Sequence, residues 1–207
     1  MATGTSVASM WRVALTFDTE HADRPFEDEG TAHVYDILRD RGVRATAFIQ
    51  GRWAEAYPDL ARRIADDGHL IGNHSFFHAR MDLLSPEGRR EDIERATKAV
   101  EEATGVDPRP WFRCPFGAGT RDAAVLADIE GAGYREVRWT VDPEDWRPET
   151  TGEQVQRAVL EGARADGSVV LMHPWTRGTG AAIAGIIDRL RDEGATFATV
   201  AGLDRLP

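Results

Sequence analysis

The stretch Val13-Ala14-Leu15-Thr16-Phe17-Asp18 decides which fold is expected for this chain. Five residues that suit a buried β-strand end at Phe17, and a carboxylate follows directly at Asp18. Six further short runs of apolar or β-branched residues recur along the chain: Ala45–Ile49, His69–Ile71, Trp111–Arg113, Glu136–Val141, Val169–Met172 and Phe197–Val200.

Amphipathic stretches separate most of these runs. Ile93, Ala96 and Val100 repeat at helical spacing, and Ser85 and Thr120 are predicted as N-caps of the helices that follow them. The repeated order of strand and helix predicts an α/β fold with about seven parallel strands and helices outside them. The pattern alone is compatible with an open sheet and with a barrel.

The composition indicates a globular protein, and the length of 207 residues suits one domain or a small pair; we expect a single domain over residues 1–207. Apolar residues make up 42% of the 207 and charged residues 29%, which is the ordinary globular range. The net charge of −10 and the absence of a basic cluster argue against nucleic acid and anionic membranes as partners. Cys114 is the only cysteine, which excludes an internal disulfide and a cysteine-based zinc cluster.

The chain shows no targeting signal. No apolar run approaches the ~18 residues that a membrane-spanning helix requires. The first twelve residues lack the basic and apolar regions of a signal peptide. We therefore expect a cytoplasmic protein, with a trimmed extracellular domain as the alternative.

Polar side chains stand at or just beyond the ends of five predicted strands. They are Asp18, His74, Arg113, Asp142 and His173. Because the carboxyl ends of parallel strands meet on one face of an α/β fold, these side chains are expected to form one site.

Two of the histidines indicate a metal. The i, i+4 pair His74 and His78 is able to place two imidazoles on one divalent ion, although the glutamate of the helical metalloprotease motif is missing. Two histidines hold a catalytic metal weakly, so a third ligand is required. The candidates are Asp18, Glu20 and His21.

Five motifs carry a resemblance to a known family. In chain order they are Thr16-Phe17-Asp18, His74-Ser75-x-x-His78, Arg113-x-Pro115-Phe116-Gly117, Asp142-x-x-Asp145-Trp146 and Leu171-Met172-His173. This series resembles the polysaccharide deacetylases, which are the NodB homology domains of carbohydrate esterase family 4. The resemblance implies a distorted (β/α) barrel with about seven parallel strands. It also implies a metal-dependent hydrolase of non-peptide carbon–nitrogen bonds, which deacetylates an N-acetylated sugar or oligosaccharide.

The resemblance also assigns roles to the acid–base residues. Asp18 would be the general base that takes a proton from the attacking water, and His173 the general acid that protonates the departing amine. Arg113 would keep Asp18 ionised and oriented. Asp142 or Asp145 would orient His173 or Arg113.

The remaining roles concern the metal and the acyl group. His74 and His78 would bind one divalent ion, with zinc expected first and cobalt, nickel or manganese as alternatives. The backbone N–H of Phe116 would stabilise the oxyanion. Trp146 and Leu171 would line the acyl pocket.

The first motif departs from the family pattern. Family members usually carry a second, metal-binding Asp where this chain has Thr19. Side chains two apart on an extended strand share a face, so Asp18 and Glu20 are expected to face the site together, with Thr19 turned away. Glu20 is therefore predicted as the third metal ligand, after His74 and His78. His21 remains a weak site candidate and the alternative base, and His33 and His69 are expected to be structural.

Two other functions remain open from the sequence. One is hydrolysis of another carbon–nitrogen bond, in a cyclic imide, a ureide or a small acylated metabolite. The other is carbohydrate binding by a remnant that has lost its metal, against which the intact Asp18, Arg113 and His173 argue. The pattern makes no prediction about the oligomeric state.

Overall fold

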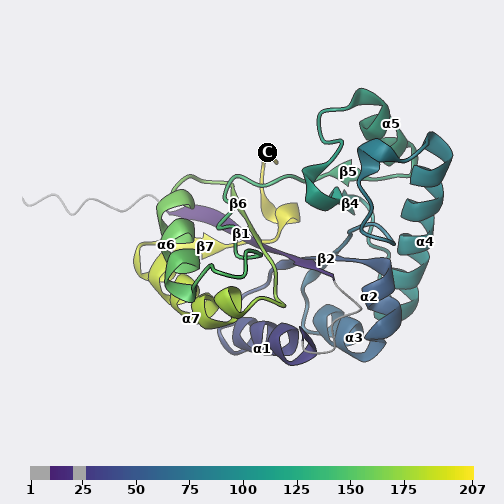
Figure 1. Cartoon of the computed structure of the whole chain (residues 1–207). Coiled ribbons are helices and arrows are strands. Elements are labelled where there is room, and N and C mark those ends of the chain that lie inside the picture. Colours follow the sequence, from purple (N-terminus) through teal and green to yellow (C-terminus); the bar gives the residue numbers. More distant parts are fainter. Residues whose placement is uncertain (1–9, 21–26) are drawn as a thin grey trace, which may run out of the picture.

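A computed structural model describes residues 10–20 and 27–207. These residues form one parallel sheet that curls into a distorted barrel (Figure 1). Its strands are β1 (Trp11–Thr19), β2 (Thr46–Ile49), β3 (Leu70–Asn73), β4 (Trp111–Phe112), β5 (Arg135–Glu136), β6 (Ser168–Met172) and β7 (Ala195–Phe197). The spatial order is β5-β4-β3-β2-β1-β6, with β7 paired to β1. The predicted α/β barrel class is therefore confirmed.

Helices surround the sheet (Figure 1). They are α1 (Glu27–Asp40), α2 (Gly51–Ala56), α3 (Pro58–Asp66), α4 (Pro86–Thr104), α5 (Ala123–Gly131), α6 (Gly152–Gly162) and α7 (Arg177–Asp192). Short 3₁₀ turns occupy Met81–Leu83, Pro115–Gly117 and Val200–Gly202. Among the described residues, no helix is both long and apolar enough to cross a lipid bilayer.

The predicted helix caps are half right. The Ser85 hydroxyl accepts the Gly88 N–H at 3.1 Å, as expected for the N-cap of α4. The cap of α5 is Asp122 instead of Thr120, and its carboxylate accepts the N–H groups of the first turn. Thr120 lies too far ahead of the helix and donates its hydroxyl to the Gly117 carbonyl at 3.0 Å.

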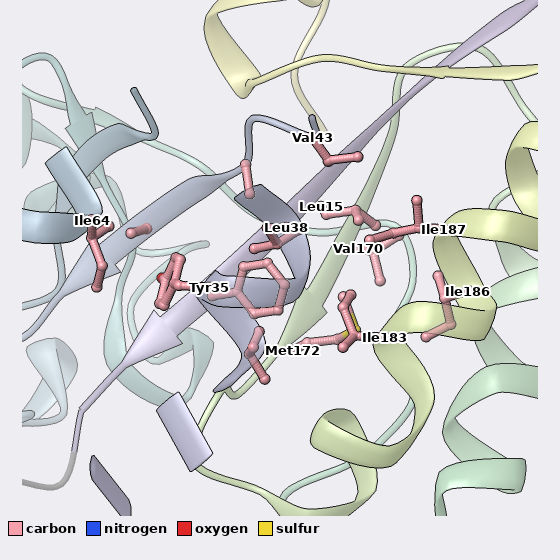
Figure 2. Packing of buried hydrophobic residues seen from close by; sticks show 14 of the residues in the cluster. Leu15, Tyr35, Leu38, Val43, Ile64, Val170, Met172, Ile183, Ile186 and Ile187 are labelled. Carbon is pink, nitrogen blue, oxygen red and sulfur yellow. The ribbon is translucent and has the colours of Figure 1, made fainter. Parts of the chain in front are cut away.

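The central strand β1 divides the interior into two regions. Its residues Val13, Leu15 and Phe17 belong to the main apolar cluster, which packs against α1 and α7 (Figure 2). Ala14 belongs to a second cluster inside the barrel. Since strand side chains alternate, Thr16 and Asp18 share the inner face with Ala14. The inner face of β1 is therefore apolar at Ala14 and polar at Thr16 and Asp18, towards the carboxyl end of the strand.

The fifth predicted strand is much shorter than expected. The run Glu136–Val141 continues the sheet only through Glu136, after which the chain leaves β4 and pairs again through a single bridge from Val141 to Val170 of β6. The Val137 carbonyl accepts the Arg113 Nε–H at 3.0 Å. Residues 137–141 thus span the gap between the two edges of the curled sheet. The last strand also differs, because β7 ends at Phe197 and Val200 begins a 3₁₀ turn.

Candidate active site

The predicted site residues gather around one pocket at the carboxyl ends of the strands. The pocket has a volume of about 470 Å³. Eight predicted residues line it: Asp18, Glu20, His78, Phe116, Asp142, Trp146, Leu171 and His173. His74, Arg113 and Asp145 lie buried behind its wall. His21 lies outside the described residues.

Glu20, His74 and His78 form a three-residue cluster. Their ligand atoms all lie within 4.8 Å of one another, with His74 Nε2 at 3.4 Å from Glu20 Oε2 and His78 Nε2 in contact with the same oxygen. His74 Nδ1 donates to the Arg113 carbonyl at 2.9 Å, which leaves the lone pair on Nε2 for a metal. Within the described residues, that buried Nε2 makes no hydrogen bond. Two imidazoles and one carboxylate with an unused buried nitrogen fit a divalent ion such as zinc.

Thr19 turns away from this cluster. Its hydroxyl lies 3.1 Å from the hydroxyl of Tyr35, on the helix side of β1. Asp18 and Glu20 both line the pocket on the other side. The alternation expected for an extended strand therefore continues through Glu20. The Glu20 carboxylate lies beside the two histidines, and Thr19 does not.

The two histidines lie on a loop after β3 and not on a helix. The loop turns sharply, with φ of 65° at Ser75 and 57° at His78, a conformation that non-glycine residues rarely adopt. The Asn73 side chain accepts the Ser75 N–H at 2.8 Å, and the Asp92 carboxylate of α4 accepts the N–H groups of the next two residues at 3.0 Å. Sequence reasoning missed Asn73 and Asp92, because only tertiary contacts show that they hold the loop.

Burial and charge act in opposite directions on the two imidazoles. Burial lowers the pKa of both, and the neighbouring carboxylates raise it. For His74 the charges of Asp18 and Glu20 prevail and the net pKa is raised, whereas for His78 burial prevails and the pKa is lowered.

Asp18 is bound to a fully buried arginine. Arg113 Nη1 donates to Asp18 Oδ1 and to Thr16 Oγ1, both at 2.8 Å. The guanidinium carbon lies 4.1 Å from the centre of the Phe48 ring. Asp18 Oδ2, the other carboxylate oxygen, lies 3.5 Å from His74 Nε2. Arg113 therefore fixes one oxygen of Asp18, and the other faces the histidine cluster.

His173 is held by Asp145. Its Nδ1 donates to Asp145 Oδ1 at 2.8 Å and its backbone N–H to Oδ2 at 2.7 Å, while the hydroxyls of Thr176 and Thr179 also donate to Oδ2. Burial alone would lower the pKa of His173, but the Asp145 carboxylate raises it to about 9. The imidazole is therefore protonated at neutral pH.

The sequence left Asp142 and Asp145 as alternatives for orienting His173 or Arg113. The structure gives that contact to Asp145. Asp142 lines the pocket and accepts the Glu144 N–H at 2.8 Å, and its described hydrogen bonds include none to His173 or Arg113. Burial raises the pKa of Asp142.

Aromatic side chains form the pocket rim. Phe116 has a φ of 59° and is 64% exposed, and its ring centre lies 4.4 Å from that of His78. Trp146 is 46% exposed. Trp139 and Trp175, to which the sequence assigned no individual role, also line the pocket. No signal in the sequence distinguishes these two tryptophans from core residues, because their exposure depends on how the loops fold.

The other two described histidines, His33 and His69, and Cys114 are not among the residues that line the pocket. His33 is exposed on α1. His69 is buried, accepts the Ala45 N–H on Nδ1 at 3.0 Å, and has its pKa lowered to about 4 by burial. Cys114 is buried, and burial together with the Glu136 carboxylate raises the pKa of its thiol. The thiol is therefore not ionised at neutral pH.

Comparison with known proteins yields a consistent set of sequence relatives. The sequence model of the polysaccharide deacetylase family matches residues 8–137. A peptidoglycan-N-acetylglucosamine deacetylase of Listeria monocytogenes is 34% identical over 189 residues, which is 91% of this chain and 38% of that protein. A chitooligosaccharide deacetylase of Azorhizobium caulinodans is 36% identical over 161 residues, 78% of this chain and 72% of that protein. The chain thus spans well under half the length of the Listeria relative.

Solved structures share the fold. A family 4 carbohydrate esterase from Streptomyces lividans, in complex with acetate, superposes with a TM-score of 0.80 at 33% identity, covering 91% of this chain and 92% of that one. A pseudoenzyme of the same esterase family from Bacillus anthracis superposes with a TM-score of 0.83 at 27% identity, covering 95% of this chain and 66% of that one. Active and inactive proteins therefore share this barrel, so the fold alone does not decide whether the chain is catalytic.

Proposed function

The chain belongs to the polysaccharide deacetylase family, and from that premise we propose that it hydrolyses the acetamide group of an N-acetylated sugar or oligosaccharide. One observation carries the proposal. Asp18 in its ion pair with Arg113, and His173 in its ion pair with Asp145, line one pocket together with the cluster of Glu20 and the two histidines. A purely carbohydrate-binding remnant has no need of a buried base and a buried acid.

Asp18 serves as the general base. Its Oδ1 is held by Arg113, so Oδ2 accepts the proton of the water that attacks the acyl carbon. The new carbon–oxygen bond converts the carbonyl oxygen to an oxyanion, which the backbone N–H of Phe116 stabilises. Glu20, His74 and His78 would hold the divalent ion, which when bound supplies Lewis acidity and lowers the pKa of water.

His173 serves as the general acid. With Nδ1 engaged by Asp145, the proton on Nε2 is available to the departing nitrogen. The carbon–nitrogen bond breaks as this proton is transferred, which yields the free amine and acetate. Because the pKa of His173 is raised to about 9, the proton is present before the reaction begins.

The test measures acetate released from N-acetylglucosamine oligosaccharides by metal-stripped protein to which single divalent ions are added. We expect one ion to restore activity and His173→Ala to lower kcat by about 10²–10⁴-fold. His33→Ala, at an exposed histidine outside the pocket, is the matched control and should leave kcat unchanged. Binding of the oligosaccharides without acetate release under any of these ions would reject the enzymatic proposal.

A further inference from the structure

A second cavity opens beside the catalytic pocket. Its volume is about 940 Å³, and it shares Phe116 and Trp139 with the catalytic pocket as a common wall. A Cβ atom at Gly117 would lie 3.2 Å from the Trp139 ring, so glycine allows this ring to approach the Phe116 loop. A ligand whose acetyl group occupies the catalytic pocket is able to continue past the two rings into this cavity.

The lining of this cavity is rich in arginine. Arg80, Arg121 and Arg138 line it together with Asp82 and Asp122. Asp82 accepts the Arg80 guanidinium at 3.0 Å, and Asp122 caps α5. Within the described residues, neither Arg121 nor Arg138 forms an ion pair. The lining therefore carries one more positive than negative charge, in a chain whose net charge is −10.

The backbone of Arg138 is held close to the candidate base. Its carbonyl accepts Arg113 Nη2 at 3.5 Å, and the preceding carbonyl, of Val137, accepts Arg113 Nε at 3.0 Å. The same guanidinium binds Asp18. The backbone that carries Arg138 and Trp139 is thus anchored to the group that holds Asp18, so the spacing between the two pockets is built into the barrel.

We infer that this cavity, named here the arginine cavity, is a subsite for a carboxylate-bearing sugar unit joined to the sugar that is deacetylated. The inference rests on the proposed function. Guanidinium groups pair with carboxylates through two parallel hydrogen bonds, and the Trp139 ring offers an apolar face to a sugar ring. The small excess of positive charge, with Asp82 and Asp122 on the same wall, suits one carboxylate better than a doubly charged phosphate.

The test compares two substrates that differ only in the charge of their lactyl carboxylates. The first is a peptide-free tetrasaccharide of alternating N-acetylglucosamine and N-acetylmuramic acid, and the second is its methyl ester at the lactyl carboxylates. We expect the wild-type protein to prefer the acid by about tenfold in kcat/KM, with the difference mostly in KM. Salt should reduce the preference, because the contact is electrostatic.

The variants should change this preference and not only the overall rate. Arg138→Gln should lower the ratio of acid to ester to about one, and Arg138→Lys should retain part of it, because lysine keeps the charge and loses the planar fork. Arg157→Gln, at an exposed arginine on α6, is the matched control and should keep the wild-type ratio. A peptide-bearing tetrasaccharide tests whether the carboxylate of a stem peptide supplies the charge instead. In that case the wild-type protein has similar kcat/KM values for the acid and the ester and prefers the peptide-bearing form. Arg138→Gln then abolishes that preference.

An unchanged ratio in Arg138→Gln and Arg121→Gln would overturn the inference. Failure of the proposed function gives a different result, because then neither acid nor ester releases acetate. The subsite is in that case tested by calorimetric binding of the acid and the ester to the same variants. Equal affinities of the wild-type protein for the two would reject it.

Discussion

In the proposed reaction, the side chain of His173 donates the proton that the departing amine takes up. Its Nδ1 and its backbone N–H both donate to Asp145, and this carboxylate raises the pKa to about 9 against the effect of burial. The positive charge of a bound divalent ion acts in the opposite direction. We therefore expect the basic limb of the kcat profile to lie at or below pH 9.

Asp145→Asn should move that basic limb to lower pH by at least ~1 unit, because burial then acts on the imidazole without the compensating charge. Profiles of kcat against pH for the wild type and Asp145→Asn measure the shift. Asp142→Asn is the comparison, since Asp142 lines the pocket and interacts with His173 through charge, without a described hydrogen bond, so a smaller shift is expected. A basic limb that stays in place in Asp145→Asn would mean that another group is the acid.

Asp18 and Glu20 are expected to separate catalysis from metal binding. Glu20→Gln should lower metal affinity by more than ~100-fold, because it removes a ligand and not merely a supporting contact. Asp18→Asn should abolish acetate release and change metal affinity only slightly. Calorimetric titration with zinc, beside an acetate assay, distinguishes the two.

Thr19→Val is the matched control at the intervening position. Its hydroxyl lies against Tyr35 on the helix side, so its loss should leave metal affinity unchanged. The reverse outcome, with metal retained in Glu20→Gln and lost in Asp18→Asn, would make Asp18 the ligand and require another base.

At the scale of elements, α4 supports the loop that carries the two histidines. The Asp92 carboxylate accepts two consecutive N–H groups of that loop, whereas the Ser85 hydroxyl accepts an N–H group of α4 itself. Asp92→Asn should cost about 1–3 kcal/mol of unfolding free energy and also lower metal affinity about tenfold. Ser85→Ala should cost about 1 kcal/mol and leave metal affinity unchanged.

Urea unfolding of the metal-free proteins and zinc titration measure the two effects. The comparison is informative because Ser85 and Asp92 both act at α4, but only Asp92 binds the loop that carries the histidines. If both variants bind zinc like the wild type, the loop does not depend on Asp92.

Strand and helix identity could be predicted from local pattern, because a buried strand and an amphipathic helix each impose their own spacing of apolar residues. The run Glu136–Val141 shows where this fails. It is apolar and β-branched enough for a strand, but beyond Glu136 it crosses between the edges of the sheet, and its Val137 carbonyl accepts the guanidinium of Arg113. The polar residues at strand ends could be predicted because parallel strands end on one face. Asn73, Asp92 and Trp139 could not, because each acts through a contact that only the folded loops create.

At the scale of the whole molecule, His69 makes stability depend on pH. Burial lowers its pKa to about 4, whereas in the unfolded chain it is near 6.5. The unfolded state therefore binds more protons between these values. The stabilisation is present above pH 6.5 and is lost as the pH falls towards 4.

The expected loss between pH 6.5 and 4 is about 2–3 kcal/mol of unfolding free energy. His69→Asn should flatten this part of the profile, and the exposed His33→Ala should not. Urea unfolding of metal-free protein at several pH values measures both. An equally steep profile in His69→Asn would assign the pH dependence to other groups.

The buried guanidinium of Arg113 bonds to two carbonyls of the segment that bridges the edges of the sheet, as well as to Asp18. Selection for folding alone is therefore enough to preserve this arginine, even in a descendant that has abandoned hydrolysis. The presence of this arginine in a related sequence is therefore weak evidence that the related protein is an active enzyme. Residues that line the pocket and do not connect the edges of the sheet, such as Glu20 and His173, distinguish active enzymes from inactive family members better.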